Sequence, residues 1–390
     1  MRRSNALVGL AFIIIGTVPT SAANSTDFSQ SSATDLLRVI SVDIGPRPMG
    51  SPAEHEAMEF AVRKLEEFGC DTAYIMPMER TQGESGRTLN TRSGVAVGIR
   101  KGTSGRIILL GAHIDSAGPE IPGANDDGSG TAVILELARV LSKRPWQSTL
   151  VFALFGGEEQ GLKGSEHFVD HFEHIDSVAL MVQVDMADGT PKLIVLADSR
   201  ERNAPSWLLR AAFEEFAALG YEGLTYETYF NTFSSLFPRP IAGSDHEPFL
   251  RKGIPAIDFT SDIAVPIHSP QDEFSNFQPQ GLKRSGDLVY RLVERFDSGV
   301  PDPKTETYWL FQAGWTLIFV ERWALWTFIG VSIIVALSTM FVVSKRTVPA
   351  QSHERISLSG GKLFLILFII MALVPTSGFF VGLLKGWRHP

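Results

Sequence analysis

Two long segments near the C-terminus contain no charged residue, and they constrain the fold of this chain more than any other feature. Residues 323–344 and 363–384 each run for 22 positions between basic residues. Because an α-helix rises about 1.5 Å per residue, each segment is long enough to cross a hydrocarbon layer of about 30 Å. Soluble helices of this length normally carry a polar face. We therefore expect two transmembrane helices at 323–344 and 363–384, joined by a loop at 345–362 and followed by a tail at 385–390.

The N-terminus and the basic loop together predict a topology. Residues 1–23 have the pattern of a secretory signal peptide, with two arginines before an apolar run and small residues at its end. An uncleaved anchor is the alternative, although the apolar run is short for a span. The loop 345–362 holds four Lys or Arg and one Glu, which by the positive-inside rule places it in the cytoplasm. Both signals put the residues between them on the extracytoplasmic side, whether periplasmic, extracellular or lumenal.

The net charge of −8 is the sum of two unlike parts. Residues 322–390 carry +6, whereas residues 24–321 carry −16. Such an acidic body argues against nucleic-acid binding, because phosphate contacts require Lys and Arg. The single cysteine, Cys70, excludes an intramolecular disulfide. Four of the seven tryptophans cluster at 309, 315, 323 and 326, so we expect 301–322 to be a linker with an interfacial stretch before the first span.

Residues 24–300 read as one α/β domain in which apolar runs alternate with helical periodicity. The runs 106–112 and 149–155 are apolar almost throughout, which is typical of strands buried on both faces of a parallel or mixed sheet. Helices covering such a sheet would complete the domain. Further strands are expected at 94–99, 178–184, 193–197 and 256–259, and helices at 32–44, 52–68, 131–141, 163–172, 207–219 and 281–296.

Histidines and carboxylates follow several of these expected strands. In open α/β sheets the functional site lies beyond the carboxyl ends of the strands, so these side chains should meet there. Zinc takes imidazole and carboxylate ligands, and a pair of zinc ions needs a carboxylate that can bridge them. Glu158 is next to a ligand candidate and would be the general base, while Asp115 has the spacing to orient the His113 imidazole. The candidate ligands are His113, Asp126, Glu159, Asp185 and His268.

Seven ordered motifs carry a resemblance to a known family. They are RPMGS (47–51), AHIDS (112–116), GANDDGSGTA (123–132), FGGEEQGLKGSEHFV (155–169), VDM (184–186), GSDHEPF (243–249) and IHSPQDEF (267–274). The sequence resembles the co-catalytic di-zinc aminopeptidases of peptidase clan MH, which include leucyl-type aminopeptidases, endoplasmic reticulum metallopeptidases and glutaminyl cyclase relatives. A signal peptide followed by C-terminal spans resembles the membrane-anchored branch of this family. The number of spans, two, departs from that branch.

The resemblance implies a fold, two zinc ions and an activity. The fold would be a mixed, mostly parallel eight-stranded sheet flanked by helices, a phosphorylase/hydrolase-like zinc exopeptidase fold. The activity would be removal of N-terminal amino acids from peptides, with Glu158 as the base. One zinc would be held by His113, Asp126 and Asp185, and the other by Asp126, Glu159 and His268, with a cis peptide bond after Asp126. Four further residues would bind substrate or support the ligands from behind: Asp127, Asp245, His246 and Asp272.

Other functions of the same family remain open at this point. A carboxypeptidase or dipeptidase would require basic residues near the pocket, for which Arg47, Arg202 and Arg239 are candidates. A glutaminyl cyclase would use one zinc, and an inactive receptor homologue would have lost ligands. The aromatic-rich stretch 226–240 either shapes the substrate pocket or packs in the core. The sequence leaves the preferred residue, the oligomeric state and the role of the membrane tail undetermined.

Overall fold

A computed structural model describes residues 26–82, 88–90, 92–199, 202–226, 243–263 and 265–321, together with isolated positions from 323 to 338. The expected signal segment 1–23 and the second expected span 363–384 lie outside these residues. The first expected span is described only at isolated positions. Within the described part of the chain, no helix combines the length and the apolar character needed to cross a membrane.

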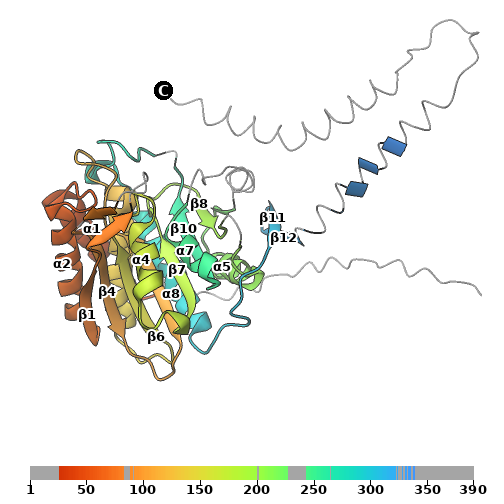
Figure 1. The fold of residues 1–390 in the computed structure, drawn as a ribbon, viewed down its shortest axis with the longest axis horizontal. Coiled ribbons are helices and arrows are strands. Elements are labelled where there is room, and N and C mark those ends of the chain that lie inside the picture. Colours follow the sequence, from red (N-terminus) through yellow and green to blue (C-terminus); the bar gives the residue numbers. More distant parts are fainter. Residues whose placement is uncertain are drawn as a thin grey trace, which may run out of the picture.

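An eight-stranded sheet forms the centre of the domain (Figure 1), as expected. Its strand order is β1-β4-β6-β5-β7-β10-β8-β9. The four central strands, from β6 to β10, are parallel, while β1, β4 and β8 pair antiparallel to their inner neighbours. The strands span Thr72–Pro77 (β1), Gly94–Arg100 (β4), Ile107–His113 (β5), Thr149–Phe155 (β6), Val178–Val184 (β7), Leu193–Leu196 (β8), Leu224–Thr225 (β9) and Ala256–Ser261 (β10). A separate short hairpin joins β2 (Arg80–Gln82) to β3 (Thr88–Asn90).

Helices cover both faces of the sheet. On one face α3 packs against β5 and β7, and α8 packs against α1, α3 and α5. On the other face α4 and α7 pack against each other, and Phe168 and Phe249 from these helices contact the ring of Phe155 on β6. The helices span Gln30–Arg38 (α1), Pro52–Glu67 (α2), Gly130–Leu141 (α3), Lys163–His171 (α4), Ser206–Ala218 (α5), His246–Lys252 (α7) and Gln280–Phe296 (α8).

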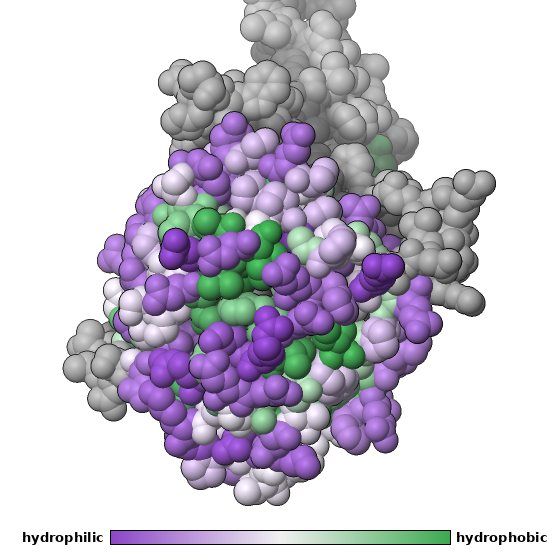
Figure 2. Space-filling view, turned by 90° about the vertical axis from the view of Figure 1, so that its left-hand side faces the viewer, coloured by the Kyte–Doolittle hydropathy of each residue, from purple (hydrophilic) through white to green (hydrophobic). Residues whose placement is uncertain are grey.

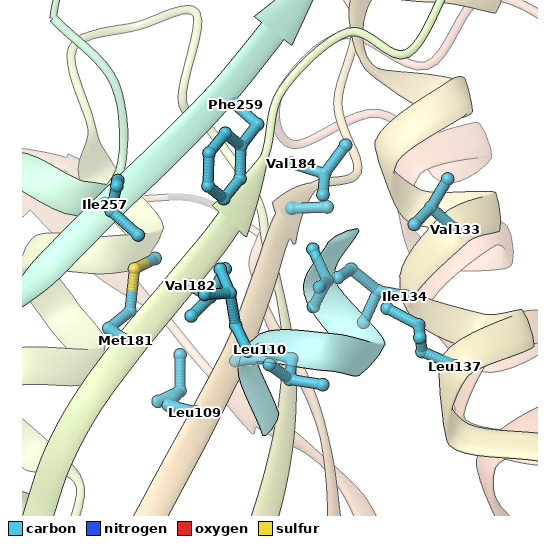
Figure 3. Packing of buried hydrophobic residues seen from close by; sticks show 14 of the residues in the cluster. Leu109, Leu110, Val133, Ile134, Leu137, Met181, Val182, Val184, Ile257 and Phe259 are labelled. Carbon is cyan, nitrogen blue, oxygen red and sulfur yellow. The ribbon is translucent and has the colours of Figure 1, made fainter. Parts of the chain in front are cut away.

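The core lies between the sheet and α3. Leu110, Val182 and Val184 on the central strands face Ile134 and Leu137 of α3 (Figure 3), and all five side chains are buried. Strands β5 and β6 are buried along almost their whole length. This burial on both faces confirms the interpretation of the apolar runs 106–112 and 149–155.

A local signal explains where α2 begins. The Ser51 side chain accepts a hydrogen bond from the Glu54 N–H, and Pro52 occupies the first turn of α2. The expected helix 32–44 is present as α1 followed by a π-helical turn at Val39–Ile44.

On the face that carries α2, hydrophilic side chains cover most of the surface, and hydrophobic ones are confined to recesses (Figure 2).

The expected linker 301–322 contains an antiparallel hairpin of β11 (Tyr308–Ala313) and β12 (Thr316–Glu321). Tyr308, Leu310 and Leu317 from its strands are buried in the core cluster of the domain. Both strands carry apolar residues on both faces, so the alternation that normally reveals a half-buried strand is absent from the sequence. For this reason the sequence did not predict the hairpin.

Candidate metal centre

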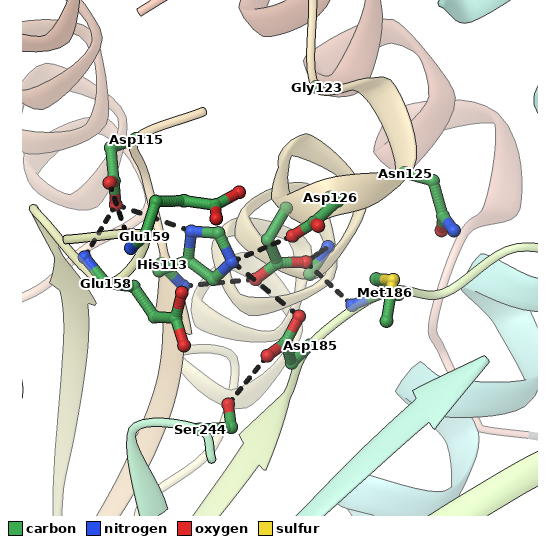
Figure 4. A network of polar contacts seen from close by, with 12 residues as sticks. His113, Asp115, Gly123, Asn125, Asp126, Glu158, Glu159, Asp185, Met186 and Ser244 are labelled. Carbon is green, nitrogen blue, oxygen red and sulfur yellow. Dashed lines mark hydrogen bonds and ion pairs between the residues drawn. The ribbon is translucent and has the colours of Figure 1, made fainter. Parts of the chain in front are cut away.

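Three neighbouring parallel strands deliver the polar residues of one site. His113 is the last residue of β5, Asp185 follows β7 directly, and the Glu158–Glu159 pair lies three residues beyond the end of β6. Because β6, β5 and β7 are adjacent and parallel, these residues lie at the same edge of the sheet (Figure 4). Asp126 joins them from the irregular turn Ala124–Ser129 that leads into α3.

The structure brings all five candidate ligands together in two groups. In the first group, His113 Nε2 lies 3.0 Å from Asp126 Oδ1 and 3.6 Å from Asp185 Oδ1. In the second group, His268 Nε2 lies 3.0 Å from Asp126 Oδ2 and 3.2 Å from Glu159 Oε2. Asp126 therefore turns one oxygen to each group, as a bridging carboxylate would. The ligand atoms of each group lie within 4.8 Å of one another.

These separations fit a divalent metal ion better than direct hydrogen bonding alone. Zinc bonds of about 2.0–2.1 Å in tetrahedral geometry hold neighbouring ligand atoms roughly 3.3 Å apart. Asp185 Oδ1 and Glu159 Oε1 are buried and have no hydrogen-bond donor among the described residues. A buried carboxylate oxygen without a donor is costly unless a cation is close to it. The residues present therefore fit two zinc ions that share Asp126.

Asp115 supports both the histidine and the glutamate loop. One of its oxygens lies 3.4 Å from His113 Nδ1, on the far side of the ring from Asp126. Its carboxylate also accepts the backbone N–H groups of Glu158, at 3.1 Å, and Glu159, at 3.3 Å. Asp115 thus takes the position expected from the His113-Ile114-Asp115 spacing, with an additional contact to the loop that the spacing did not reveal.

Asp127 contacts backbone groups of three different elements. It accepts the N–H groups of His113 at 3.0 Å, Gly130 at 2.8 Å and Met186 at 2.9 Å. These contacts tie the ends of β5 and β7 to the start of α3. The peptide bond between Asp126 and Asp127 is cis, in agreement with the resemblance.

Asp272 holds the same turn from the opposite side. Its two oxygens accept the N–H groups of Asn125 and Asp126, at 2.7 and 3.0 Å. Burial raises the pKa of Asp272 to about 6, and these two hydrogen bonds act in the opposite direction. Both Asp127 and Asp272 therefore position the backbone around Asp126, which corresponds to the supporting role among the two alternatives considered for them.

Glu158 belongs to neither ligand group. Its half-buried carboxyl group lies beside His113 and Asp185 (Figure 4). Burial raises the pKa of Glu158 well above its usual 4.5, the His113 charge lowers it, and Asp245 and Asp185 raise it further. A general base for neutral pH needs a raised pKa of this kind.

Asp245 and His246 lie at the start of α7 and are both buried. Burial raises the pKa of Asp245 to about 7 and lowers the pKa of His246 to about 4, so the imidazole stays neutral near pH 7. His246 Nε2 lies 3.2 Å from the Asp198 carbonyl oxygen. Neither residue belongs to the two ligand groups.

The sequence did not single out three buried polar residues around the site, Ser244, Gln183 and Glu54. Ser244 donates a hydrogen bond of 2.6 Å to Asp185 Oδ2, and Gln183 Nε2 donates to Ser244 at 2.6 Å. Glu54 on α2 accepts hydrogen bonds from the Gly50 N–H at 2.6 Å and the Ser93 hydroxyl at 2.8 Å. Ser244 lies within GSDHEPF, where the adjacent acid and histidine were the more conspicuous candidates.

Arg47 is not a pocket residue, in contrast to one expectation. Its side chain is completely buried, and it donates hydrogen bonds to the carbonyls of Ile114, Pro122 and Gly123 at 2.6, 2.5 and 2.8 Å. Burial lowers its pKa, whereas four surrounding aspartates raise it: Asp115, Asp127, Asp272 and Asp126. Of the other two basic candidates, Arg202 donates a hydrogen bond to the Thr305 hydroxyl, and Arg239 lies outside the described residues.

Solved structures share this fold. A zinc aminopeptidase from Bacillus subtilis, BSAP, superimposes with a TM-score of 0.58 at 20% identity, covering 70% of this chain and 96% of that one. Porphyromonas gingivalis glutaminyl cyclase gives a TM-score of 0.55 at 21% identity, covering 69% of this chain and 98% of that one. At these identities the similarity establishes the fold alone.

Sequence comparison identifies the family. Aminopeptidase YwaD of Bacillus subtilis (strain 168) is 32% identical over 231 residues, which cover 55% of this chain and 47% of that protein. A probable zinc metalloprotease of Pyrenophora tritici-repentis is 28% identical over 233 residues, covering 52% and 53%. The chain thus spans about half the length of these relatives. The model of "Peptidase family M28" matches residues 95–293, just over half of the chain. The chain therefore belongs to peptidase family M28.

Proposed function

We propose that this protein is a membrane-anchored, extracytoplasmic metallopeptidase that uses two zinc ions to remove N-terminal amino acids from peptides. The observation that carries the proposal is the pair of ligand groups that share Asp126, with Glu158 beside them. The relatives named as aminopeptidase and zinc metalloprotease support the same reaction class.

The residues of this chain would divide the work of hydrolysis. When bound, the zinc ions would polarise the scissile carbonyl and make a nearby water more acidic. Glu158 would take the proton from that water and pass it to the leaving amine. Asp115 would keep His113 in the tautomer whose Nε2 is free for a ligand bond, and would fix the loop that carries Glu158.

A glutaminyl cyclase with one zinc is the second candidate, because a solved cyclase has the same fold. Asp185 favours the two-metal enzyme over the cyclase. Its Oδ1 lies 3.6 Å from His113 Nε2 without a hydrogen-bond donor among the described residues, and Ser244 directs its other oxygen away. This arrangement would suit a ligand of a second metal ion better than a purely structural carboxylate.

The anchoring and the location rest on the sequence. The two uncharged 22-residue segments would span the membrane, and the basic loop 345–362 would lie in the cytoplasm. The domain that holds the metal centre would then face the extracytoplasmic side. A reporter active only in the cytoplasm should therefore function when fused near His353 and be silent when fused after Pro390.

The direct test is hydrolysis of aminoacyl chromogenic amides by the purified full chain, combined with metal analysis. We expect about two zinc ions per chain and turnover that is lost with chelation and restored by zinc. Cyclisation of a peptide with an N-terminal glutamine, measured as release of ammonia, tests the cyclase activity in the same preparation. A protein that binds one metal or none and hydrolyses no aminoacyl amide would refute the proposed reaction.

A further inference from the structure

The hairpin β11–β12 has two faces of different kinds. Its inner face packs on the domain. We call the opposite side of the two strands the outer face, where Trp309 pairs with Val320 and Phe311 pairs with Ile318. Thr316 lies on the same face. None of these five described side chains is charged, although the hairpin belongs to the most acidic part of the chain.

Contacts of the inner face hold the hairpin in one orientation. The Tyr308 hydroxyl donates a hydrogen bond of 2.6 Å to the Ala204 carbonyl. The ring of Phe319 packs edge-on against Tyr308, with centroids 4.9 Å apart, and lies under the Arg210 guanidinium at 4.7 Å. Because these contacts fix the inner face, the hairpin cannot turn its apolar outer face inward.

Several large apolar side chains of the hairpin are exposed. Phe311 is 42% exposed and Ile318 is 48% exposed, and Trp315 at the tip of the hairpin is 52% exposed. Single exposed apolar residues are common on proteins, but a connected group of large ones usually marks a contact surface. Figure 1 shows the hairpin on the side of the domain away from α2, next to α5.

The position of the hairpin in the chain identifies the kind of partner. Strand β12 ends at Glu321, and the uncharged segment 323–344 begins two residues later. Two residues span at most about 7 Å of extended chain. If this segment enters a bilayer, the hairpin must lie at the bilayer surface, where Trp and other aromatic side chains are favoured.

We propose that the outer face of the hairpin docks on the interfacial layer of a lipid bilayer and fixes the orientation of the catalytic domain above it. This inference rests on the proposed membrane anchoring. It adds that the domain is held against the membrane through a second contact, rather than tethered to it by a flexible linker.

Gln312 also joins the inner face to the end of the central sheet. Its side chain accepts a hydrogen bond of 2.6 Å from the Tyr226 N–H and donates one of 3.2 Å to the Leu224 carbonyl of β9. These contacts add to those of Tyr308 and Phe319 in holding the hairpin against the domain.

Spin labelling of the full chain in phosphatidylcholine proteoliposomes tests the docking. Cys70 is the single cysteine, so a Cys70→Ser background allows one label at a time. Ile318→Cys and Thr316→Cys place the label on the outer face, and Thr316→Cys does so without removing an apolar side chain. Val42→Cys is the matched control, because Val42 is 51% exposed in the α1 region of the domain. Each variant is first checked for unchanged hydrolysis of an aminoacyl amide.

The readout is the collision rate of the label with oxygen, which concentrates in lipid, relative to a water-soluble nickel chelate. We expect this ratio to be several-fold higher at 318 and 316 than at 42. If the protein resists carbonate extraction but the labels at 318 and 316 are as accessible to nickel as the control, the docking is overturned and the anchoring stands. Protection from both reagents would show a protein partner instead and would also overturn it. Release of the protein by carbonate would refute the anchoring and the docking together, while peptidase activity remains a separate measurement.

Discussion

Replacing Arg47 by methionine should destabilise the domain strongly. The substitution removes the donors that lie 2.6 and 2.5 Å from the carbonyls of Ile114 and Pro122. Leaving the buried Ile114 acceptor without its donor costs about 1–3 kcal/mol, whereas the Pro122 carbonyl is partly exposed and can bind water instead. A domain of this size loses about 2–4 °C in Tm for each kcal/mol, which predicts a fall of roughly 2–12 °C. Gly123 retains a second donor, the Gly128 N–H, and is not counted.

The loss of thermal stability in Arg47→Met should be larger without metal than with it. The buried guanidinium is surrounded by Asp115, Asp126, Asp127 and Asp272. In the metal-free protein its charge offsets part of their mutual repulsion, whereas bound zinc ions would supply that compensation themselves. The increase in Tm on adding zinc should therefore be greater for Arg47→Met than for the wild-type chain. Arg47→Lys, which keeps the charge but not the fork of donors, should fall between them.

Thermal unfolding with chelator and with added zinc measures both effects. Arg144→Met is the control for loss of an arginine at the surface, because Arg144 is exposed and its contacts are an ion pair with Glu294 and stacking on the Trp146 ring. If Arg47→Met unfolds at the wild-type temperature under both conditions, the cost assigned to the carbonyls is wrong. If it loses the same amount with and without zinc, Arg47 holds the backbone but does not compensate the carboxylates.

Three further predictions concern the site and its surroundings. Glu158→Gln should keep the metal content of the wild-type chain and lower kcat by about 10²–10⁴-fold, because it removes the base and no ligand; wild-type turnover would show that another group takes the proton. Gly156→Ala should lower kcat, since its Cβ would lie 2.5 Å from Glu54 Oε1 and displace the glutamate loop, whereas Gly105→Ala, which meets nothing within 4 Å, should be silent in the same assay. His246→Gln should reduce the acid sensitivity of folding. The folded-state pKa of His246 is about 4 against 6.5 in the unfolded chain, so the unfolded state binds the extra proton as the pH falls from 6.5 to 4. The wild-type chain should lose about 3 kcal/mol more than the variant across this window, and parallel stability curves would contradict this reasoning.

The helix and sheet layers of the domain and the candidate metal ligands could be predicted, because each of them depends on a short stretch of sequence. Apolar runs such as 149–155 identify buried strands by themselves, and the residue after a strand end lies at the functional edge of a parallel sheet. His113, Glu159 and Asp185 were found in this way, whereas Asp126 and His268 came from polar clusters in loops; the structure brings all five together. Strand order and the antiparallel edge strands could not be derived, because they depend on pairing between distant segments.

The supporting contacts could not be predicted for a related reason. Arg47 is separated by 67 residues from the carbonyl of Ile114, and its role becomes visible only when the turn around Gly123 is folded against it. An arginine in a loop is normally exposed, and the sequence offered Arg47 only as one candidate for the basic residues that a carboxypeptidase or dipeptidase would need. The hairpin β11–β12 was missed because its strands are apolar on both sides, and only the packing of Tyr308 and Leu310 separates the inner face from the outer one.

The acidic surplus of the domain serves two physical purposes that composition cannot separate. Asp126, Asp185 and Glu159 turn oxygens toward the two ligand groups. Asp127 and Asp272 instead accept backbone N–H groups, which orient the turn that carries Asp126. An N–H donor stabilises a carboxylate by roughly 1.5–3 kcal/mol without adding a positive charge, so a carboxylate of this second kind can remain buried beside the first. Asp127 and Asp272 therefore position Asp126 through the backbone, and removing either of them should disorganise the site even though no ligand is lost.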